Sequence, residues 1–442
     1  MLDHLKKLYK LNSIYAVIGV ANTLLFIFYV GVSERTDIWF ASLAIITTFS
    51  KIFMVGFINE IFLPRLVRSW GRSVQYAEHL LSNIFIAVGA LGFFSVALII
   101  LFSSPLTNLL YSSISVEGRE EIAFIMKCAA PLLIFILMNE LMSMVLNSRE
   151  LYTYPEKARI FSSILNFIII LFLFSRINIW ALYVASIVSH SFNFVILGAV
   201  ILKNKIKISF QFRLKTWRNA KFKNSITSAS FYVLITQIYS VAFRSYLSTF
   251  PPGMITVFQY VETIIIKGRS LVMRPLANVA LTDFSKPIKL QSGKPVWKFL
   301  FGYFSALSVI FFSLGVLIRY FGIYVLLHLL DTSEYSQLIW FRSLLAFFVI
   351  MIPFEIILVV GRKKIVSVGL FRIFYYYSGI TQALVAAIIL SAIYFNIISL
   401  YTIYLVVSVD VFSKILGVIV LLANTNNITL GTLRKLIKRD GG

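Results

Sequence analysis

Long apolar stretches alternate along the chain with short polar and charged segments. Each apolar stretch is roughly 20 residues or longer, the length that an α-helix needs to cross a bilayer. They fall at 11–30, 38–64, 80–103, 121–146, 157–175, 179–202, 225–247, 254–282, 296–318, 335–360, 371–395 and 397–422. The pattern predicts an all-α polytopic membrane protein with about 12 transmembrane helices.

Composition supports this fold class. The chain has 442 residues, of which 59% are hydrophobic and only 13% are charged. A soluble domain is closer to half apolar and a quarter charged, so a soluble enzyme is excluded. The single cysteine, Cys128, excludes an internal disulfide, and the four histidines are too scattered for a metal site. We therefore expect no metal and no cofactor.

The basic residues that give the net charge of +23 are distributed unevenly between the two sides of the predicted topology. If the N-terminus is inside, most Lys and Arg residues fall in inside segments, and the outside loops hold only Arg35, Arg119, Arg176 and Arg319. This asymmetry is the positive-inside pattern of a multi-pass membrane protein. It predicts that both termini are cytoplasmic, and it assigns the basic surplus to topology and anionic lipid rather than to nucleic acid.

The longest inside segment divides the predicted spans into six and six. Residues 203–224 are strongly basic and contain no acid. We interpret 1–202 as an N-lobe, 203–224 as a cytoplasmic linker, 225–422 as a C-lobe and 423–442 as a cytoplasmic tail. The linker could also be an amphipathic helix on the inner leaflet. No outside loop is long enough to suggest a catalytic domain beyond the membrane.

Several charged residues fall inside the predicted spans, where each costs about 2.5–3.5 kcal/mol even on a lenient insertion scale. They should therefore face a hydrated cavity or one another. The bases are Lys51, Lys127, Arg244, Lys267, Arg269, Arg274, Arg342 and Lys414, and the acids are Glu60, Glu140, Glu262, Glu355 and Asp410. Bases outnumber acids, and Arg and Lys form charge-assisted hydrogen bonds with phosphate oxygens. The excess favours an anionic cargo such as a pyrophosphate.

The eighth span carries the densest group of these charges. Lys267 and Arg274 are seven residues apart and share one helix face, as do Glu262 and Arg269 on a different face. The first pair has no acid within helical reach and is the better cavity candidate. The second pair fits either an ion pair with a neighbouring helix or a cavity wall. Asp410 and Lys414 have the spacing of an intrahelical ion pair.

The stretch 31–66 resembles the early region of MurJ/MviN-type lipid flippases, members of the multidrug/oligosaccharidyl-lipid/polysaccharide (MOP) exporter superfamily. The family shows a glycine, then Thr-Asp, aromatics and alanine, followed in the next helix by a glycine and an aromatic-apolar-Pro stretch. The matching positions are Gly31, Thr36-Asp37, Trp39-Phe40, Ala41, Gly56 and Phe62-Leu63-Pro64. The resemblance implies two six-helix lobes, MOP/MATE-like, around a central V-shaped cavity, and transport by alternating access.

The chain departs from the family pattern in two places. The family usually has Arg-Asp nine and eight residues before the motif glycine, where this chain has Asn22 and Thr23. It also lacks the two additional C-terminal helices that are common in MurJ. A twelve-span relative with a Wzx-like role fits better, namely a flippase for O-antigen, capsule or exopolysaccharide repeat units, with lipid II as a further candidate.

These observations lead to a set of residue assignments. We expect the pyrophosphate of a polyprenyl-pyrophosphate-linked oligosaccharide to meet Lys51, Arg244, Lys267, Arg269 and Arg274. Asn22, Thr23 and Gln237 are candidates for the cavity lining. Asp37, Glu60, Glu140, Glu262 and Glu355 are candidates for gating or for coupling to an ion or the membrane potential.

The expected setting is the bacterial cytoplasmic (inner) membrane. The expected partners are the lipid-linked glycan, membrane lipids, and the polymerase and glycosyltransferases of the same pathway, with the flippase itself a monomer. Two alternatives remain open at this point: a MATE-like small-molecule exporter, which needs carboxylates in the cavity, and a membrane glycan polymerase or ligase.

Overall fold

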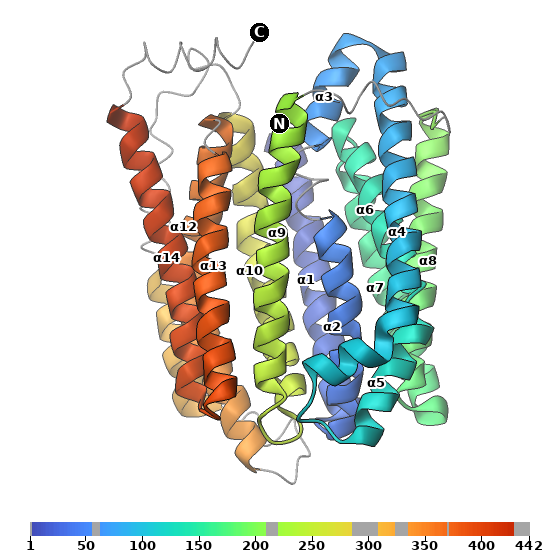
Figure 1. Ribbon diagram of the computed structural model, residues 1–442. Coiled ribbons are helices and arrows are strands. Elements are labelled where there is room, and N and C mark those ends of the chain that lie inside the picture. The colour runs from blue at the N-terminus through green and yellow to red at the C-terminus, as the bar shows by residue number, and fades with distance from the viewer. Residues whose placement is uncertain are drawn as a thin grey trace.

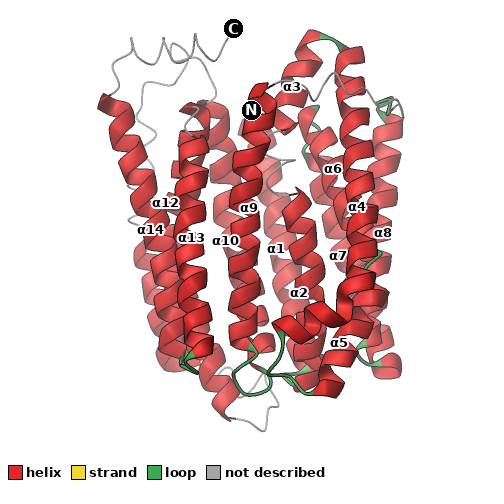
Figure 2. Cartoon of the chain, in the orientation of Figure 1, coloured by secondary structure: helices red, strands yellow, loops and turns green. Residues whose placement is uncertain are grey.

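The computed structural model describes residues 2–54, 62–208, 220–284, 308–322, 335–368 and 371–427. Over these residues the regular structure is helical, without strands (Figure 2). The helices are α1 (Leu2–Val30), α2 (Glu34–Met54), α3 (Leu63–Arg72), α4 (Val74–Leu110), α5 (Val116–Ala129), α6 (Leu132–Ser148), α7 (Thr153–Ile177), α8 (Trp180–Lys203), α9 (Ala220–Leu247), α10 (Met254–Phe284), α12 (Tyr335–Val368), α13 (Phe371–Tyr394) and α14 (Leu400–Asn427). A further apolar helical segment covers Ser308–Gly322.

Each predicted apolar span overlaps a helix, so the all-α fold class is confirmed. Two spans differ from the single helices that hydropathy predicts. The second begins as α2, and its C-terminal residues form the start of α3. The fourth is divided into α5 and α6, which are bent by 47°. Pro131 lies at this break, and because proline has no N–H it cannot continue the hydrogen-bond ladder of α5.

The helices form two lobes that lie side by side (Figure 1). In the first lobe α7 packs on α8, and α4 packs on α5 and α6; in the second, α9 packs on α13 and α10 on α12. Most contact between the lobes comes from α1 and α2, which meet α9 and α10, and α4 adds a smaller contact with α9. Any rearrangement of one lobe against the other must therefore change the contacts of these four helices.

The two ends of the bundle differ in which segments they carry. α1 begins, α3 lies and α14 ends at the same end, which we call the terminal end (Figure 1). The start of α2, the helix α5 and the turn between α9 and α10 lie at the opposite end, which we call the far end. In the predicted topology the far end faces away from the cytoplasm.

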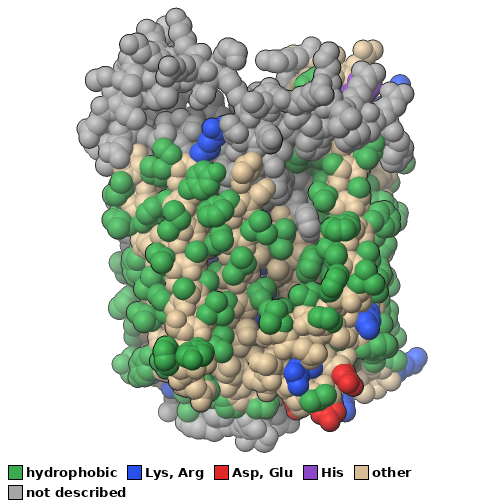
Figure 3. All heavy atoms as spheres, in the orientation of Figure 1, with side chains coloured by type: hydrophobic (Ala, Val, Ile, Leu, Met, Phe, Trp, Pro, Cys, Tyr) green, Lys and Arg blue, Asp and Glu red, His purple; other side chains and the backbone are tan. Residues whose placement is uncertain are grey.

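The flanks of the molecule are apolar on the outside. Within the described residues, six helical segments are long and apolar enough to cross a membrane: α4, α7, α8, Leu338–Val359 of α12, Arg372–Tyr394 of α13 and Leu400–Leu421 of α14. Large hydrophobic side chains are mostly exposed on them, among them Phe93 and Leu101 on α4 and Leu384 on α13. Figure 3 shows hydrophobic side chains over much of the visible flank. An exposed apolar surface of this extent indicates a lipid environment, so the chain is a multi-pass membrane protein.

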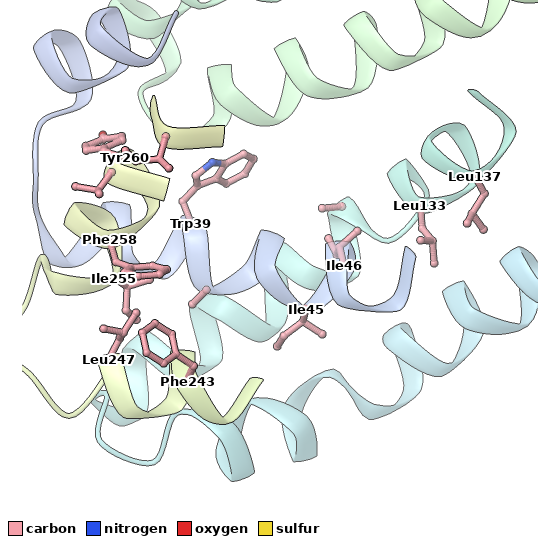
Figure 4. Packing of buried hydrophobic residues seen from close by; sticks show 14 of the residues in the cluster. Trp39, Ile45, Ile46, Leu133, Leu137, Phe243, Leu247, Ile255, Phe258 and Tyr260 are labelled. Carbon is pink, nitrogen blue, oxygen red and sulfur yellow. The ribbon is translucent and has the colours of Figure 1, made fainter. Parts of the chain in front are cut away.

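A compact apolar cluster joins the lobes toward the far end (Figure 4). Trp39 from α2 and Tyr260 from α10 are both only 2% exposed, and Phe243 and Leu247 of α9 belong to the same cluster. The rings of Phe40 and Tyr260 pack edge to face with centroids 5.5 Å apart, within the favourable range for aromatic pairs. This cluster fixes the position of α10 against α2.

Close packing within the second lobe depends on Gly417. The ring of Tyr377 on α13 rests on this glycine of α14, and a Cβ atom there would come within 2.2 Å of the ring. The Tyr377 hydroxyl donates a hydrogen bond to the Ser413 carbonyl at 2.9 Å, so the ring cannot simply move away.

We expect Gly417→Ala to lower the melting temperature of the detergent-solubilised protein, because overpacking a core costs about 1–3 kcal/mol. Gly89→Ala is the matched control, since a Cβ atom at Gly89 meets only Met138 at an ordinary 3.7 Å. Scanning fluorimetry of both variants measures the difference. Equal melting temperatures for the two variants would show that the α13–α14 contact adapts freely.

Candidate substrate-binding and gating site

The motif around Gly31 positions Asp37 at the far end. Gly31 has φ 68°, a left-handed conformation that suits glycine and ends α1. Ser33 then caps α2: the Thr36 N–H donates to Ser33 Oγ at 3.3 Å, and the Ser33 N–H donates to Thr36 Oγ1 at 2.9 Å. Asp37 is therefore held in the first turn of α2, with its side chain directed away from its own helix.

The Asp37 carboxylate caps the N-terminus of α10. It accepts hydrogen bonds from the Gly253 N–H at 2.6 Å and from the N–H and Oγ1 of Thr256 at 2.7 and 2.6 Å. Asp37 is 7% exposed. A carboxylate at a helix N-terminus satisfies unpaired N–H groups and interacts favourably with the helix dipole. Asp37 was predicted as a candidate for gating or coupling, and in the structure it caps α10 by accepting hydrogen bonds from backbone and hydroxyl groups.

Further contacts close the far end around this cap. The Tyr260 hydroxyl donates to the Gly31 carbonyl at 2.9 Å, which ties α10 to the end of α1. Ser113 Oγ donates to the Ser248 carbonyl at 2.8 Å, which ties the α4–α5 turn to the α9–α10 turn. Burial raises the pKa of Tyr111 to about 12, so this tyrosine stays neutral and donates to the Ala41 carbonyl at 3.3 Å. The two lobes are thus joined at the far end by directional hydrogen bonds.

A polar cavity of about 190 Å³ lies between α9, α10, α12 and α14. Its walls combine aromatic and aliphatic side chains with charged groups from all four helices. The charged and hydroxyl-bearing residues that line it are Tyr239, Ser240, Arg244, Glu262, Arg269, Glu355 and Asp410. Three of the predicted intramembrane acids and two of the predicted bases are therefore brought together in one place.

The charges in this cavity are paired unevenly. Arg269 forms a close ion pair with Glu355. Lys414 pairs with Asp410 at 2.7 Å, as their spacing predicted. Arg244 Nη2 and Glu262 Oε2 are 4.0 Å apart, the longest of these pairs. The sequence favoured the Lys267/Arg274 stripe of α10 for the cavity, but the opposite stripe, Glu262 and Arg269, lines it.

Lys51 joins this group from the other lobe. It lies on α2, is half-buried, and has Glu262 and Arg244 as the charged groups whose fields act on it among the described residues. Lys51 therefore lies within electrostatic reach of Arg244 and Glu262 across the junction of the lobes. Two cations and one anion leave a local excess of positive charge.

Lys267 contacts α1 rather than the cavity. Its Nζ donates to the Tyr15 hydroxyl at 2.8 Å and lies 3.9 Å from the centre of the Tyr15 ring. Its aliphatic chain packs on Gly19, where a Cβ atom would come within 2.7 Å of it. The contact makes a second connection between the lobes, closer to the terminal end. Tyr15 was not predicted, because a tyrosine within an apolar run has no sequence signal that marks it as a partner.

The remaining predicted residues lie elsewhere. Asn22 donates from Nδ2 to the Ser163 carbonyl and Oγ at 3.2 and 3.0 Å, so it fixes α1 to α7. Thr23 donates to the carbonyl of Gly19 in its own helix at 2.9 Å. Gln237 is buried, and its Oε1 has no hydrogen-bond partner within the described part of the chain. None of the three lines the cavity described above.

Glu140 pairs with Arg159 at 3.5 Å, and Arg159 is also bound by Glu156 at 3.1 Å. This cluster ties α6 to α7 within the first lobe. Glu60 and the side chain of Arg274 lie outside the described residues, so their predicted roles stay predictions. In the residues that the structure covers, no group of three or more His, Cys, Asp or Glu is placed to hold a metal ion.

Comparison with protein families gives one match that spans most of the chain. The family described as "Lipid II flippase MurJ" matches residues 27–409. The chain belongs to the MurJ lipid II flippase family. Membership confirms the resemblance found in the Gly31–Pro64 region, and it makes this MurJ-family chain a transporter of the flippase type rather than an enzyme.

Solved structures show the same fold. A structure titled "Lipid II flippase MurJ, inward closed conformation" is similar with a TM-score of 0.71 and 18% identity, covering 95% of this chain and 87% of that one. An inward-facing MATE-family multidrug transporter has a TM-score of 0.66 and 14% identity, covering 97% and 95%. A MOP superfamily transporter from Pyrococcus furiosus has a TM-score of 0.62 and 13% identity, covering 96% of each chain. No curated protein sequence matches this MurJ-family chain.

We expect Asp37→Asn to open the far end. The amide loses the charge and directs an NH₂ group at backbone donors, and hydrogen bonds to a charged group are worth about 1.5–3 kcal/mol. A cysteine introduced at buried Phe258, with Cys128 replaced by serine, should then react about tenfold faster or more with a membrane-impermeant thiol reagent.

Glu34→Gln is the matched control for this variant. It removes a carboxylate from the same turn of α2, but Glu34 is exposed. An equal labelling rate in Asp37→Asn and in the control would show that the cap on α10 does not hold the far end closed.

Proposed function

We propose that this protein flips a polyprenyl-pyrophosphate-linked oligosaccharide from the cytoplasmic to the outer leaflet by alternating access. Lys51, Arg244 and Arg269 are the groups that meet the pyrophosphate. The cargo class that fits best is an O-antigen, capsule or exopolysaccharide repeat unit, with lipid II as the alternative. No covalent chemistry is required, so we assign no catalytic residue.

One observation carries this proposal: spare positive charge at the junction of the lobes. Arg244 and Glu262 of the second lobe are 4.0 Å apart, and Lys51 of the first lobe lies within electrostatic reach of both. A charge at membrane depth costs about 2.5–3.5 kcal/mol on the insertion scale. A cation without a matching anion therefore destabilises the fold, and its presence needs a functional reason. An anion that enters between the lobes would balance it, and phosphate oxygens match both side chains.

The contacts between the lobes support a cycle of opening and closing. The Asp37 cap closes the far end, and the Lys267–Tyr15 contact lies closer to the terminal end. In the proposed cycle the Asp37 cap breaks when the cavity opens outward and forms again when it opens inward. The apolar flanks leave the polyprenyl chain in the surrounding lipid, while the sugar passes through the hydrated space between the lobes.

The proposed setting is the bacterial cytoplasmic membrane with both termini in the cytoplasm. The basic segment 203–224 would then lie against the anionic inner leaflet. Moving one net charge across the membrane is worth about 2.3 kcal/mol per 100 mV, so a cationic site can couple transport to the membrane potential. Polymerases and glycosyltransferases that make and use the same repeat unit are the proposed pathway partners.

The test is a flipping assay in proteoliposomes with a fluorescent polyprenyl-pyrophosphate-linked oligosaccharide. We expect Lys51→Ala to slow flipping about tenfold or more, because losing one charged hydrogen bond to the cargo removes about 1.5–3 kcal/mol. Lys203→Ala is the matched control and should flip at the wild-type rate, since Lys203 is exposed at the end of α8.

Two results would contradict the proposal. One is a wild-type protein that does not flip the lipid at all but exports cationic dyes, as the MATE-like fold would allow. The other is equal flipping by Lys51→Ala and Lys203→Ala at equal amounts of reconstituted protein, which would remove the cationic site from the mechanism.

A further inference from the structure

The cavity between α9, α10, α12 and α14 has an aromatic wall. Tyr239, Phe243, Phe258 and Phe348 line it, and successive rings in this order have centroids 6.1, 5.0 and 5.8 Å apart. These distances fall in the range of packed aromatic pairs, so the rings form one continuous row. The row is built from three helices, and it offers an apolar surface to whatever the cavity holds.

The charges that line this cavity are balanced within the described residues. Each of the three carboxylates has one cation beside it. The pairs are Arg269–Glu355, Lys414–Asp410 and Arg244–Glu262. Lys51, which supplies the positive excess at the lobe junction, does not line the cavity. An ion inside the cavity would leave an uncompensated charge at membrane depth, which is costly. The cavity therefore suits an uncharged ligand.

The polar groups of the cavity still have hydrogen-bonding capacity. Asp410 Oδ2 accepts from Lys414 at 2.7 Å, but Asp410 Oδ1 is buried without a hydrogen-bond partner within the described residues. A buried acceptor that stays unpaired is costly, so a donor is expected there. The side chains of Glu262 and Arg269 are each 32% exposed, so their remaining acceptor and donor positions can be reached. The ligand that fits therefore both donates and accepts hydrogen bonds.

The size of the cavity limits the ligand to one small ring. Its volume is about 190 Å³, below the roughly 300–1,000 Å³ of pockets that hold drug-sized ligands. We infer that the cavity is a subsite for one uncharged sugar ring of the cargo, whose hydroxyl groups bind the paired charges while a C–H face packs on the aromatic row. This inference rests on the proposed function, whose cargo carries sugar, and adds where one sugar lies. Arg244 lines the cavity and is within electrostatic reach of Lys51, so a pyrophosphate at the lobe junction places the adjoining sugar at the cavity.

The test measures binding of three soluble probes to the full-length protein in lipid nanodiscs by titration calorimetry. Each probe is a short prenyl diphosphate of the same charge, and its other end carries a methyl, a cyclohexyl or a glucosyl group. The cyclohexyl group has the ring size of the sugar without its hydroxyl groups. We expect the glucosyl probe to bind about tenfold or more tightly than either of the others, because only its hydroxyl groups can bind the charged side chains.

Two variants place the sugar in this cavity. Val407 lines it, so Val407→Phe fills the space and should abolish the preference for glucose while the methyl probe binds as before. Val409→Phe is the matched control, because Val409 is on the same helix but is 38% exposed on the outside, and it should keep the preference. Asp410→Asn combined with Lys414→Gln keeps the cavity electrically balanced but removes the charged acceptor. It should weaken the glucosyl probe severalfold and leave the methyl probe unchanged.

The outcomes separate this inference from the proposed function. If the wild type binds none of the probes, the proposed function itself fails. If it binds all three equally, the cavity holds only water and the sugar subsite is overturned, while the proposed function stands. The subsite is also overturned if the glucose preference survives in both cavity variants at wild-type melting temperatures, because the sugar then binds elsewhere. If Val407→Phe does not fold, the Asp410→Asn, Lys414→Gln protein decides alone.

Discussion

A charged side chain at membrane depth must find a partner, and this constraint organises the interior of the protein. The low dielectric makes an unpaired charge far more costly there than in water. Arg159 is accordingly held by Glu140 and Glu156, Arg269 by Glu355, and Lys414 by Asp410. At the lobe junction, by contrast, Arg244 lies 4.0 Å from Glu262, and Lys51 is within electrostatic reach of both. A local excess of positive charge inside the membrane is expected where a site binds an anion.

The helix α10 connects this site to the far-end closure. Its N-terminus is capped by Asp37 and, about 12 Å further along at 1.5 Å per residue, Glu262 faces the cavity. Lys267 then contacts α1, and Arg269 pairs with α12. All these contacts are made by the single helix α10, on different faces of it. A shift of α10 that breaks the cap must therefore also disturb the charge pairs. The far-end closure and the proposed cargo site thus depend on the same helix.

The sequence predicted the helices better than it predicted their contacts. Span number and order follow from hydropathy, since burying the backbone in lipid requires helices. Asp37 was predicted only as a candidate for gating or coupling, because nothing in the local sequence shows that its carboxylate reaches α10. Helical periodicity gave the two stripes of α10 without showing which faces which neighbour. Lys267 was therefore expected in the cavity, but in the structure it contacts Tyr15 and Gly19 on α1.

Asn22 is an uncharged residue at a position where the family usually has a charged one. The family usually has an arginine at this position, whereas Asn22 is bonded to Ser163 on α7 and contributes no charge. The positive charge missing from α1 must then come from elsewhere if the cargo is still an anion. Lys51 on α2 and Arg244 on α9 provide it at the junction of the lobes. Because α2 and α9 meet across the junction, the proposed anion site would lie on the contact between the lobes. Binding there would act directly on the contact between the lobes, which is the contact that alternating access must change.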